Sequence, residues 1–209
     1  MPNANTILDV QRIAKRFGAR VLFEDLSFSI AEGQKVGLIA RNGTGKSTLL
    51  TILTGIESAD SGTIVYRNGT RIGFLEQEPH FEPTDTVLEA CFDHKGDEDR
   101  VTKARQILTR LKIKDLEQPM GQLSGGQRKR VALARVLAAE PDFLILDEPT
   151  NHLDLEMIEW LEGFLSKGGK TLLMVTHDRY FLDHVCNTIL ELDDFQLYSY
   201  RGNYAYYIE

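Results

Sequence analysis

The sequence predicts an α/β fold that combines a mostly parallel sheet core with an antiparallel β lobe and a small helical segment. The core is predicted by three short, nearly continuous apolar runs at residues 36–39, 143–146 and 172–175. Strands of this kind are buried on both faces, as in a parallel sheet that is covered by helices. Helical patterns follow these runs at residues 46–53, 157–165 and 179–186. Strands that alternate with helices indicate an α/β core.

The antiparallel lobe is predicted from strand patterns in the first part of the chain. Residues 26–30 alternate between apolar side chains and serines, which is typical of a strand with one buried face. Residues 63–66 and 71–75 flank Asn68-Gly69, a dipeptide that predicts a hairpin between them. One further helix is expected over residues 126–139, because the apolar residues there recur on one face.

Composition and charge limit the classes of function. A chain of 209 residues with 42% hydrophobic and 26% charged residues fits a single domain, which we expect to span residues 1–209. No apolar run approaches the roughly 20 residues that cross a bilayer, and the first residues lack the basic and apolar regions of a secretory signal. We therefore expect a cytoplasmic protein without direct membrane insertion. The net charge of −7 argues against nucleic-acid binding by the whole surface, although not by a local basic patch.

A phosphate-binding loop is predicted at residues 36–50, which read VGLIARNGTGKSTLL. An apolar strand, a glycine-containing loop and a helix follow one another, and the loop nearly matches G-x-x-x-x-G-K-[ST]. In such loops the backbone N–H groups and the positive end of the helix hold phosphates, so we expect Lys46 to bind the β- and γ-phosphates of ATP and Ser47 to bind Mg²⁺. The first glycine of the pattern is replaced by Ala40, whose methyl group would strain a turn with positive φ. The expected nucleotide-binding residues of the loop are Asn42, Gly43, Thr44, Gly45, Lys46, Ser47 and Thr48.

Two adjacent acids follow the apolar run at residues 143–146. In α/β sheets, ligands gather at the carboxyl ends of the strands, where Asp147 and Glu148 would lie. We expect Asp147 to hold Mg²⁺, directly or through water, and Glu148 to polarise the attacking water, an effect typically worth about 10²–10⁴ in rate. A solvated strand end is the alternative for an isolated Asp-Glu pair, and the phosphate loop upstream favours the catalytic interpretation.

Residues 123–127 read LSGGQ, and with the two preceding elements they make the chain resemble the ATPase domains of the ABC superfamily. The resemblance covers nearly the whole chain. It implies that Gln77 is the Q-loop glutamine near Mg²⁺ and water, that residues 151–154 are the D-loop, and that His177 is the switch histidine. Phe17 stands where the family usually has an aromatic residue that stacks on adenine. A core position is the alternative interpretation for both Phe17 and His177.

The LSGGQ segment also predicts an anion-binding site at the start of a helix. Ser124 and the N–H groups of Gly125 and Gly126, followed by Gln127, would form a second anion-binding helix end. In the ABC family this end contacts the γ-phosphate that a partner domain holds, so that two domains enclose two ATP molecules head to tail. The resemblance therefore implies a Mg-dependent ATPase in which ATP binding joins two domains and hydrolysis releases them.

The amino-acid sequences of residues 123–137 and 147–160 are similar to those of the ABC-F branch, the soluble paired ATPases that act on ribosomes, and especially to its Uup-like members. Residues 197–208 resemble the end of a first ATPase domain, just before the linker to the second. These resemblances imply that the chain is the N-terminal half of a longer two-domain protein, or a single domain. The partner would then be a second ABC ATPase domain, in the same chain or in a homodimer.

A helical subdomain is expected over about residues 78–137. Only 46 residues, 78–123, separate Gln77 from Ser124, which is short for the arm that ABC-F first domains use against the ribosome. Residues 95–114 hold seven Lys or Arg and three acids, and both an RNA-facing patch and a solvated helix face explain them. Two functions stay open: an ATPase that acts on ribosomes in translation or on structured nucleic acid, and the motor subunit of a membrane transporter, whose partner would be a membrane subunit.

Overall fold

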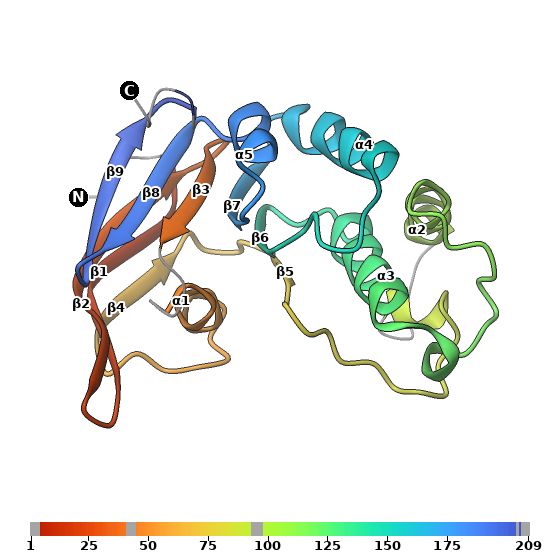
Figure 1. The fold of residues 1–209 in the computed structure, drawn as a ribbon, viewed down its shortest axis with the longest axis horizontal. Coiled ribbons are helices and arrows are strands. Elements are labelled where there is room, and N and C mark those ends of the chain that lie inside the picture. Colours follow the sequence, from red (N-terminus) through yellow and green to blue (C-terminus); the bar gives the residue numbers. More distant parts are fainter. Residues whose placement is uncertain (1–4, 41–44, 93–97, 204, 206–209) are drawn as a thin grey trace.

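The structure is a computed structural model that describes residues 5–40, 45–92, 98–203 and 205. Two sheets and a group of helices make up the fold (Figure 1). The strands are β1 (Thr6–Phe17), β2 (Arg20–Ala31), β3 (Lys35–Ala40), β4 (Ser61–Tyr66), β5 (Ile72–Leu75), β6 (Phe143–Asp147), β7 (Thr171–Val175), β8 (Thr188–Asp193) and β9 (Gln196–Arg201). The α-helices are α1 (Lys46–Leu53), α2 (Glu98–Arg110), α3 (Gly125–Ala138), α4 (Leu155–Ser166) and α5 (Arg179–Val185), and short 3-10 helices lie at Glu89–Cys91 and Met120–Gln122.

The large sheet has the strand order β5-β6-β7-β3-β8-β9, in which neighbouring strands are parallel except for the antiparallel β8–β9 pair. The three apolar runs form β3, β6 and β7, so the prediction of a mostly parallel core is confirmed. Phe143 and Ile145 of β6 belong to one hydrophobic cluster, whereas Leu144 and Leu146 belong to another. The runs are continuously apolar because alternate side chains enter cores on opposite faces of the sheet.

The two clusters define the layers of the molecule. One cluster joins the β lobe and α1 to one face of the large sheet. The other joins α2, α3, α4 and α5 to the opposite face. The helices predicted from the sequence are confirmed as α1, α3, α4 and α5, each within two residues of the expected ends. The catalytic candidates on the sheet therefore lie between a β lobe and a helical region.

The β lobe is a separate antiparallel sheet with the order β2-β1-β4. The strand predicted over residues 26–30 is confirmed as part of β2, with Leu26 and Ile30 buried and the serines between them exposed. The predicted hairpin at Asn68-Gly69 is wrong, because β4 pairs with β1 whereas β5 pairs with β6 in the other sheet. The chain does turn after β4, but Leu75 is buried in the helical cluster, and this burial decides the partner of β5.

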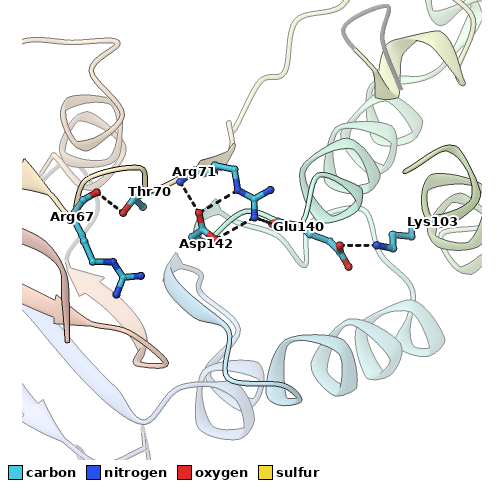
Figure 2. Close-up of polar contacts among 6 residues, drawn as sticks. All are labelled: Arg67, Thr70, Arg71, Lys103, Glu140 and Asp142. Atoms are coloured by element: carbon cyan, nitrogen blue, oxygen red, sulfur yellow. Dashed lines mark hydrogen bonds and ion pairs between the residues drawn. The ribbon is translucent and has the colours of Figure 1, made fainter. Parts of the chain in front are cut away.

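A polar network links the start of β5 to the helical region. Arg71 donates to the Asp142 carboxylate from its backbone N–H (2.9 Å), Nε (3.2 Å) and Nη2 (3.2 Å), and Nη2 also donates to the Glu140 carbonyl at 3.0 Å. Lys103 of α2 donates to the Glu140 carboxylate at 2.7 Å (Figure 2). The Arg71 guanidinium lowers the pKa of Asp142 below its ordinary value. The network joins β5, the end of α3 and α2 on the molecular surface.

Both cysteines are buried and free. Burial raises the pKa of the Cys91 and Cys186 thiols to about 12, so both thiols stay protonated at neutral pH. Within the described ranges of the chain, no helix combines the length and the apolar character that crossing a membrane requires.

Candidate nucleotide-binding site

The phosphate loop connects β3 to α1. Asn42, Gly43 and Thr44 lie outside the described residues. Gly45 precedes α1 with φ +94°, and a Cβ added there would lie 3.1 Å from the Leu22 Cβ. A positive φ and this close approach to the β lobe both favour glycine at position 45 over a residue with a side chain.

Ala40 does not strain the start of the loop. It ends β3, pairs with Leu192 of β8 and is not among the described non-glycine residues with positive φ. The strain that a methyl group could introduce at this position is therefore absent. The Ala40 carbonyl instead accepts a hydrogen bond from the Lys46 ammonium at 2.9 Å.

Lys46, Ser47 and Asp147 form the charged centre of the site. Burial lowers the pKa of Lys46, and the Glu148 and Asp147 carboxylates oppose this shift. Burial raises the pKa of Asp147, and a hydrogen bond from the Ser47 hydroxyl opposes it. An ammonium beside a hydroxyl and a carboxylate fits both groups that the sequence implies: the cation faces phosphate, and hard oxygen ligands suit Mg²⁺.

Glu148 is held in an unusual conformation beside His177. Its φ is +50°, a sparsely populated value for a residue with a side chain, and its N–H donates to the Val175 carbonyl at 2.8 Å. Its carboxylate accepts the backbone N–H of His177 at 3.3 Å and lies 3.4 Å from His177 Nε2. The Glu148 side chain is 9% exposed, whereas that of His177 is 66% exposed. The pair thus joins a buried carboxylate to an imidazole at the surface of the site.

One pocket of about 430 Å³ gathers most of the predicted residues. Phe17 ends β1 at its rim and is 52% exposed, which a core residue would not be. Its adenine-stacking role stays a prediction. Arg20 and Leu22 of β2 also line the pocket, although no sequence pattern singled them out. The predicted residues that line it are Phe17, Gly45, Lys46, Ser47, Thr48, Gln77, Asp147, Glu148 and His177.

The LSGGQ segment lies elsewhere. Ser124 caps α3 in a capping box: its hydroxyl accepts the Gln127 N–H at 3.2 Å, and its own N–H donates to the Gln127 side chain at 2.9 Å. Gly125 lines a different groove, of about 460 Å³, together with Gln77 and residues of the predicted D-loop. A Cβ added to Gly126 would lie 3.2 Å from the His152 Cβ, so the D-loop packs directly on this helix end. The starts of α1 and α3 are well separated in Figure 1.

A model of the family described as "ABC transporter" matches residues 23–151, more than half of the chain. The chain belongs to this ABC family. The family assignment agrees with the order of the motifs in this chain. ATP binding is the property that the domains of this family share.

Curated relatives of this ABC domain are longer proteins. An uncharacterized ABC transporter ATP-binding protein, YfmR of Bacillus subtilis, is 39% identical over 98% of this chain and 39% of its own length. The energy-dependent translational throttle protein EttA of Mycobacterium tuberculosis is 34% identical over 99% of this chain and 44% of its own length. The chain therefore spans less than half the length of these relatives.

Solved structures share the ABC fold. The ATP-binding subunit of an ABC transporter has a TM-score of 0.84 and 22% identity, with 94% of this chain and 90% of that chain covered. A dimeric ATP-binding cassette in a post-hydrolysis state with ADP and Pi has a TM-score of 0.78 and 24% identity, with 93% and 98% covered. At these identities the likeness shows the fold, which confirms the predicted ABC ATPase architecture.

One residue of the site was missed by sequence reasoning. Lys129 of α3 is 5% exposed, and its ammonium donates to backbone carbonyls beside the pocket. A signal was present, because Lys129 is three and seven residues before Ala132 and Val136 and therefore shares a side of the predicted helix with these two apolar residues. A lysine on an apolar side of a helix needs partners inside the protein.

Proposed function

We propose that this domain binds and hydrolyses ATP with Mg²⁺, as one member of a head-to-tail pair of ABC ATPase domains. The observation that carries the proposal is the composition of a single pocket. Lys46, Ser47 and Asp147 offer a cation and oxygen ligands there, and Glu148 lies beside them. These are the groups that phosphoryl transfer to water needs: charge on the phosphates, a metal ligand set and a carboxylate for the nucleophile.

Each residue has a separate task in this proposal. The Lys46 ammonium and the helix end after Gly45 stabilise the charge of the β- and γ-phosphates. Ser47 and Asp147 would hold Mg²⁺, which would supply further positive charge to the phosphates. Glu148 orients the attacking water and accepts its proton, while His177 fixes the Glu148 carboxylate from the exposed side. Gln77, which lines the same pocket, completes the surroundings of the water and the metal.

A second domain is proposed because the Ser124 end of α3 lies outside this pocket. Ser124 and Gly125 are exposed, and Gly125 lines a groove other than the one that contains Lys46. A helix start with free N–H groups is an anion site. The phosphate it would cover is the one held by a partner domain, in the same longer chain or in a second copy.

The proposed target is the ribosome, on which the domain would act as part of a cytoplasmic ABC-F protein. The ABC-F-like sequence of residues 123–137 and the similarity to a translational throttle protein support this assignment. The stretch matched to YfmR extends over 244 residues, more than the 209 of this chain, so that relative carries extra residues within it. An arm shorter than that of the relatives would accordingly limit the contacts this domain makes with RNA.

The basic segment at residues 95–114 contributes less to RNA binding than its composition indicates. Lys112 lies 2.7 Å from the Asp154 carboxylate and 2.8 Å from that of Glu156, and Lys103 bonds Glu140. Lys95 lies outside the described residues. The cations of this segment that remain exposed for phosphate contact are Arg105, Arg110 and Lys114.

Co-sedimentation with ribosomes tests the proposal. The Glu148→Gln variant of the full protein should retain ATP, lose turnover and enrich on ribosomes when ATP and Mg²⁺ are present. The matched control is Lys46→Ala combined with Glu148→Gln, which should neither bind ATP nor enrich. Hydrolysis by Glu148→Gln at the parent rate would remove Glu148 from its role, and a trapped variant that never enriches would contradict the ribosomal target alone.

The motor subunit of a membrane transporter is the second candidate. The groove of about 460 Å³ between residues 77–81 and α3 is the observation that favours it, since a helix of a membrane subunit could dock there. Genes for transmembrane subunits beside this one, and co-purification of the Glu148→Gln variant with membranes rather than with ribosomes, would support this candidate.

A further inference from the structure

We propose that Lys129 is a positioning residue that ties the partner-facing helix α3 to the Gln77 and Asp147 segments of this chain's own site. A shift of α3 when a partner engages Ser124 would then move the residues that surround the metal and the water. This role presupposes the paired ATPase proposed above and adds a physical link between its two sites.

The contacts of the Lys129 ammonium carry the proposal. Nζ donates to the carbonyl oxygens of Glu76 at 2.6 Å, Gln77 at 3.1 Å and Asp147 at 3.0 Å. A lysine ammonium has three N–H donors, and here all three are used on backbone. Two of the carbonyls belong to the segment after β5 and the third ends β6, so one side chain fixes both segments to α3.

The cost of burying Lys129 indicates a purpose beyond packing. An apolar side chain would suit the stripe of α3, whereas a buried ammonium loses its hydration and needs compensation. Burial lowers the pKa of Lys129, while the nearby carboxylates of Asp147, Glu148 and Glu76 favour its charged form. The site therefore places a structural cation behind its own carboxylates, at a position that a methionine or leucine would fill more simply.

A second contact, between Arg135 and Phe81, also joins α3 to the segment at residues 77–81. The Arg135 guanidinium lies 4.4 Å from the centroid of the Phe81 ring, so α3 holds the segment at residues 77–81 at both ends. Ser124 caps the same helix little more than one turn before Lys129. Because an α-helix moves nearly as a unit over this length, a displacement at Ser124 reaches Gln77 without any rearrangement of side chains.

Steady-state hydrolysis by the full protein tests the role. Lys129→Met removes the three donors at similar length, and we expect kcat to fall by about 10- to 100-fold, as for a small misplacement of reacting groups. The KM for ATP and the ATP affinity measured by calorimetry should stay within about twofold, because Lys46 and Gly45 are untouched. Lys129→Arg should restore most of kcat. The control is Lys170→Met, an equal change of charge at a lysine that lies 4.8 Å from the Phe164 ring, and it should hydrolyse as the parent does.

A double-mutant cycle separates coupling from local packing. If Lys129 transmits what Ser124 senses, the combined loss in Ser124→Ala with Lys129→Met should be smaller than the product of the two single losses, whereas independent effects would multiply. Should Lys129→Met unfold near the assay temperature, Lys129→Gln, which keeps two donors on a shorter side chain, is measured in its place, and it should show a smaller fall in kcat with unchanged ATP affinity. Parent-like kcat in a folded variant, multiplicative losses, or failure of Lys129→Arg to recover would each overturn the proposal. The parent rate and its loss in Glu148→Gln report on the ATPase itself, so a failure at Lys129 leaves that assignment standing.

Discussion

Glu148 shows how much of the proposed chemistry depends on single residues. It combines a positive φ of 50° with a carboxylate bound by the His177 N–H, directly after a buried strand. A non-glycine residue in this region costs on the order of 1–3 kcal/mol, and the strand and the hydrogen bonds around it must compensate. The strained turn separates Asp147 from Glu148, so that neighbouring acids can serve different groups: one the metal, the other the water.

The proposed stacking of Phe17 on adenine can be tested by substitution. Phe17→Ala should weaken ATP and ADP binding equally, by about 1–3 kcal/mol, since base stacking on an aromatic ring contributes this much. Phe17→Trp should retain the affinity. Calorimetric titration of the Glu148→Gln background with each nucleotide measures the effect, and unchanged affinity in Phe17→Ala would return Phe17 to an ordinary role at the end of β1.

Among the elements, α1 and α3 differ in how the backbone N–H groups of their first turns are satisfied. The α1 start has no side-chain cap, and Gly45 at its N-cap has a positive φ. The α3 start is closed by the capping box of Ser124 and Gln127. An uncapped start leaves N–H groups for a ligand, whereas a capping box satisfies two of them within the chain. We therefore expect Gln127 to support the helix end, with Ser124 and the glycines left to meet a phosphate.

Two substitutions of Ser124 separate these tasks. Ser124→Ala should lower the free energy of unfolding by about 0.5–2 kcal/mol, because the cap is lost. Ser124→Asp keeps a capping oxygen and should unfold near the parent midpoint in urea, yet its negative charge should repel the partner's γ-phosphate and abolish hydrolysis. An active Ser124→Asp variant would show that this helix end does not meet phosphate.

For the whole molecule, the division into two hydrophobic clusters separates the two proposed anion sites. The pocket with Lys46 lies on the side of the β lobe and α1, whereas Ser124 begins a helix of the other cluster. Figure 1 shows α1 and α3 at different places along the long axis of the molecule. This separation agrees with the proposed head-to-tail pair, in which each domain would complete the site of the other.

Complementation between inactive variants tests this arrangement when the partner is a second copy. Lys46→Ala and Ser124→Asp should each be inactive, yet a mixed pair contains one intact composite site. An equal mixture should thus regain about a quarter of the parent rate if copies pair at random. The control mixture of Lys46→Ala with Glu148→Gln damages both sites and should stay inactive. Equal rates in the two mixtures, measured by phosphate release over a range of concentrations, would contradict the head-to-tail pair.

Local features of this protein could be predicted from its amino-acid sequence. The continuous apolar runs predicted β3, β6 and β7, because burial on both faces leaves that mark on any strand. The loop before Lys46 and the two acids at the end of β6, Asp147 and Glu148, indicated the phosphate and metal chemistry, since such groups need fixed residue types at fixed spacing.

Features that depend on contacts between distant segments became clear from the three-dimensional structure. Asn68-Gly69 marked a turn correctly, but the partner of β5 was chosen by the burial of Leu75 against the helices. Lys129 became a buried link because two segments far away in the chain end beside α3. The exposure of Phe17 likewise follows from where β1 ends relative to the pocket. Local patterns encode which faces must be buried, and the assembled chain determines which surfaces meet them.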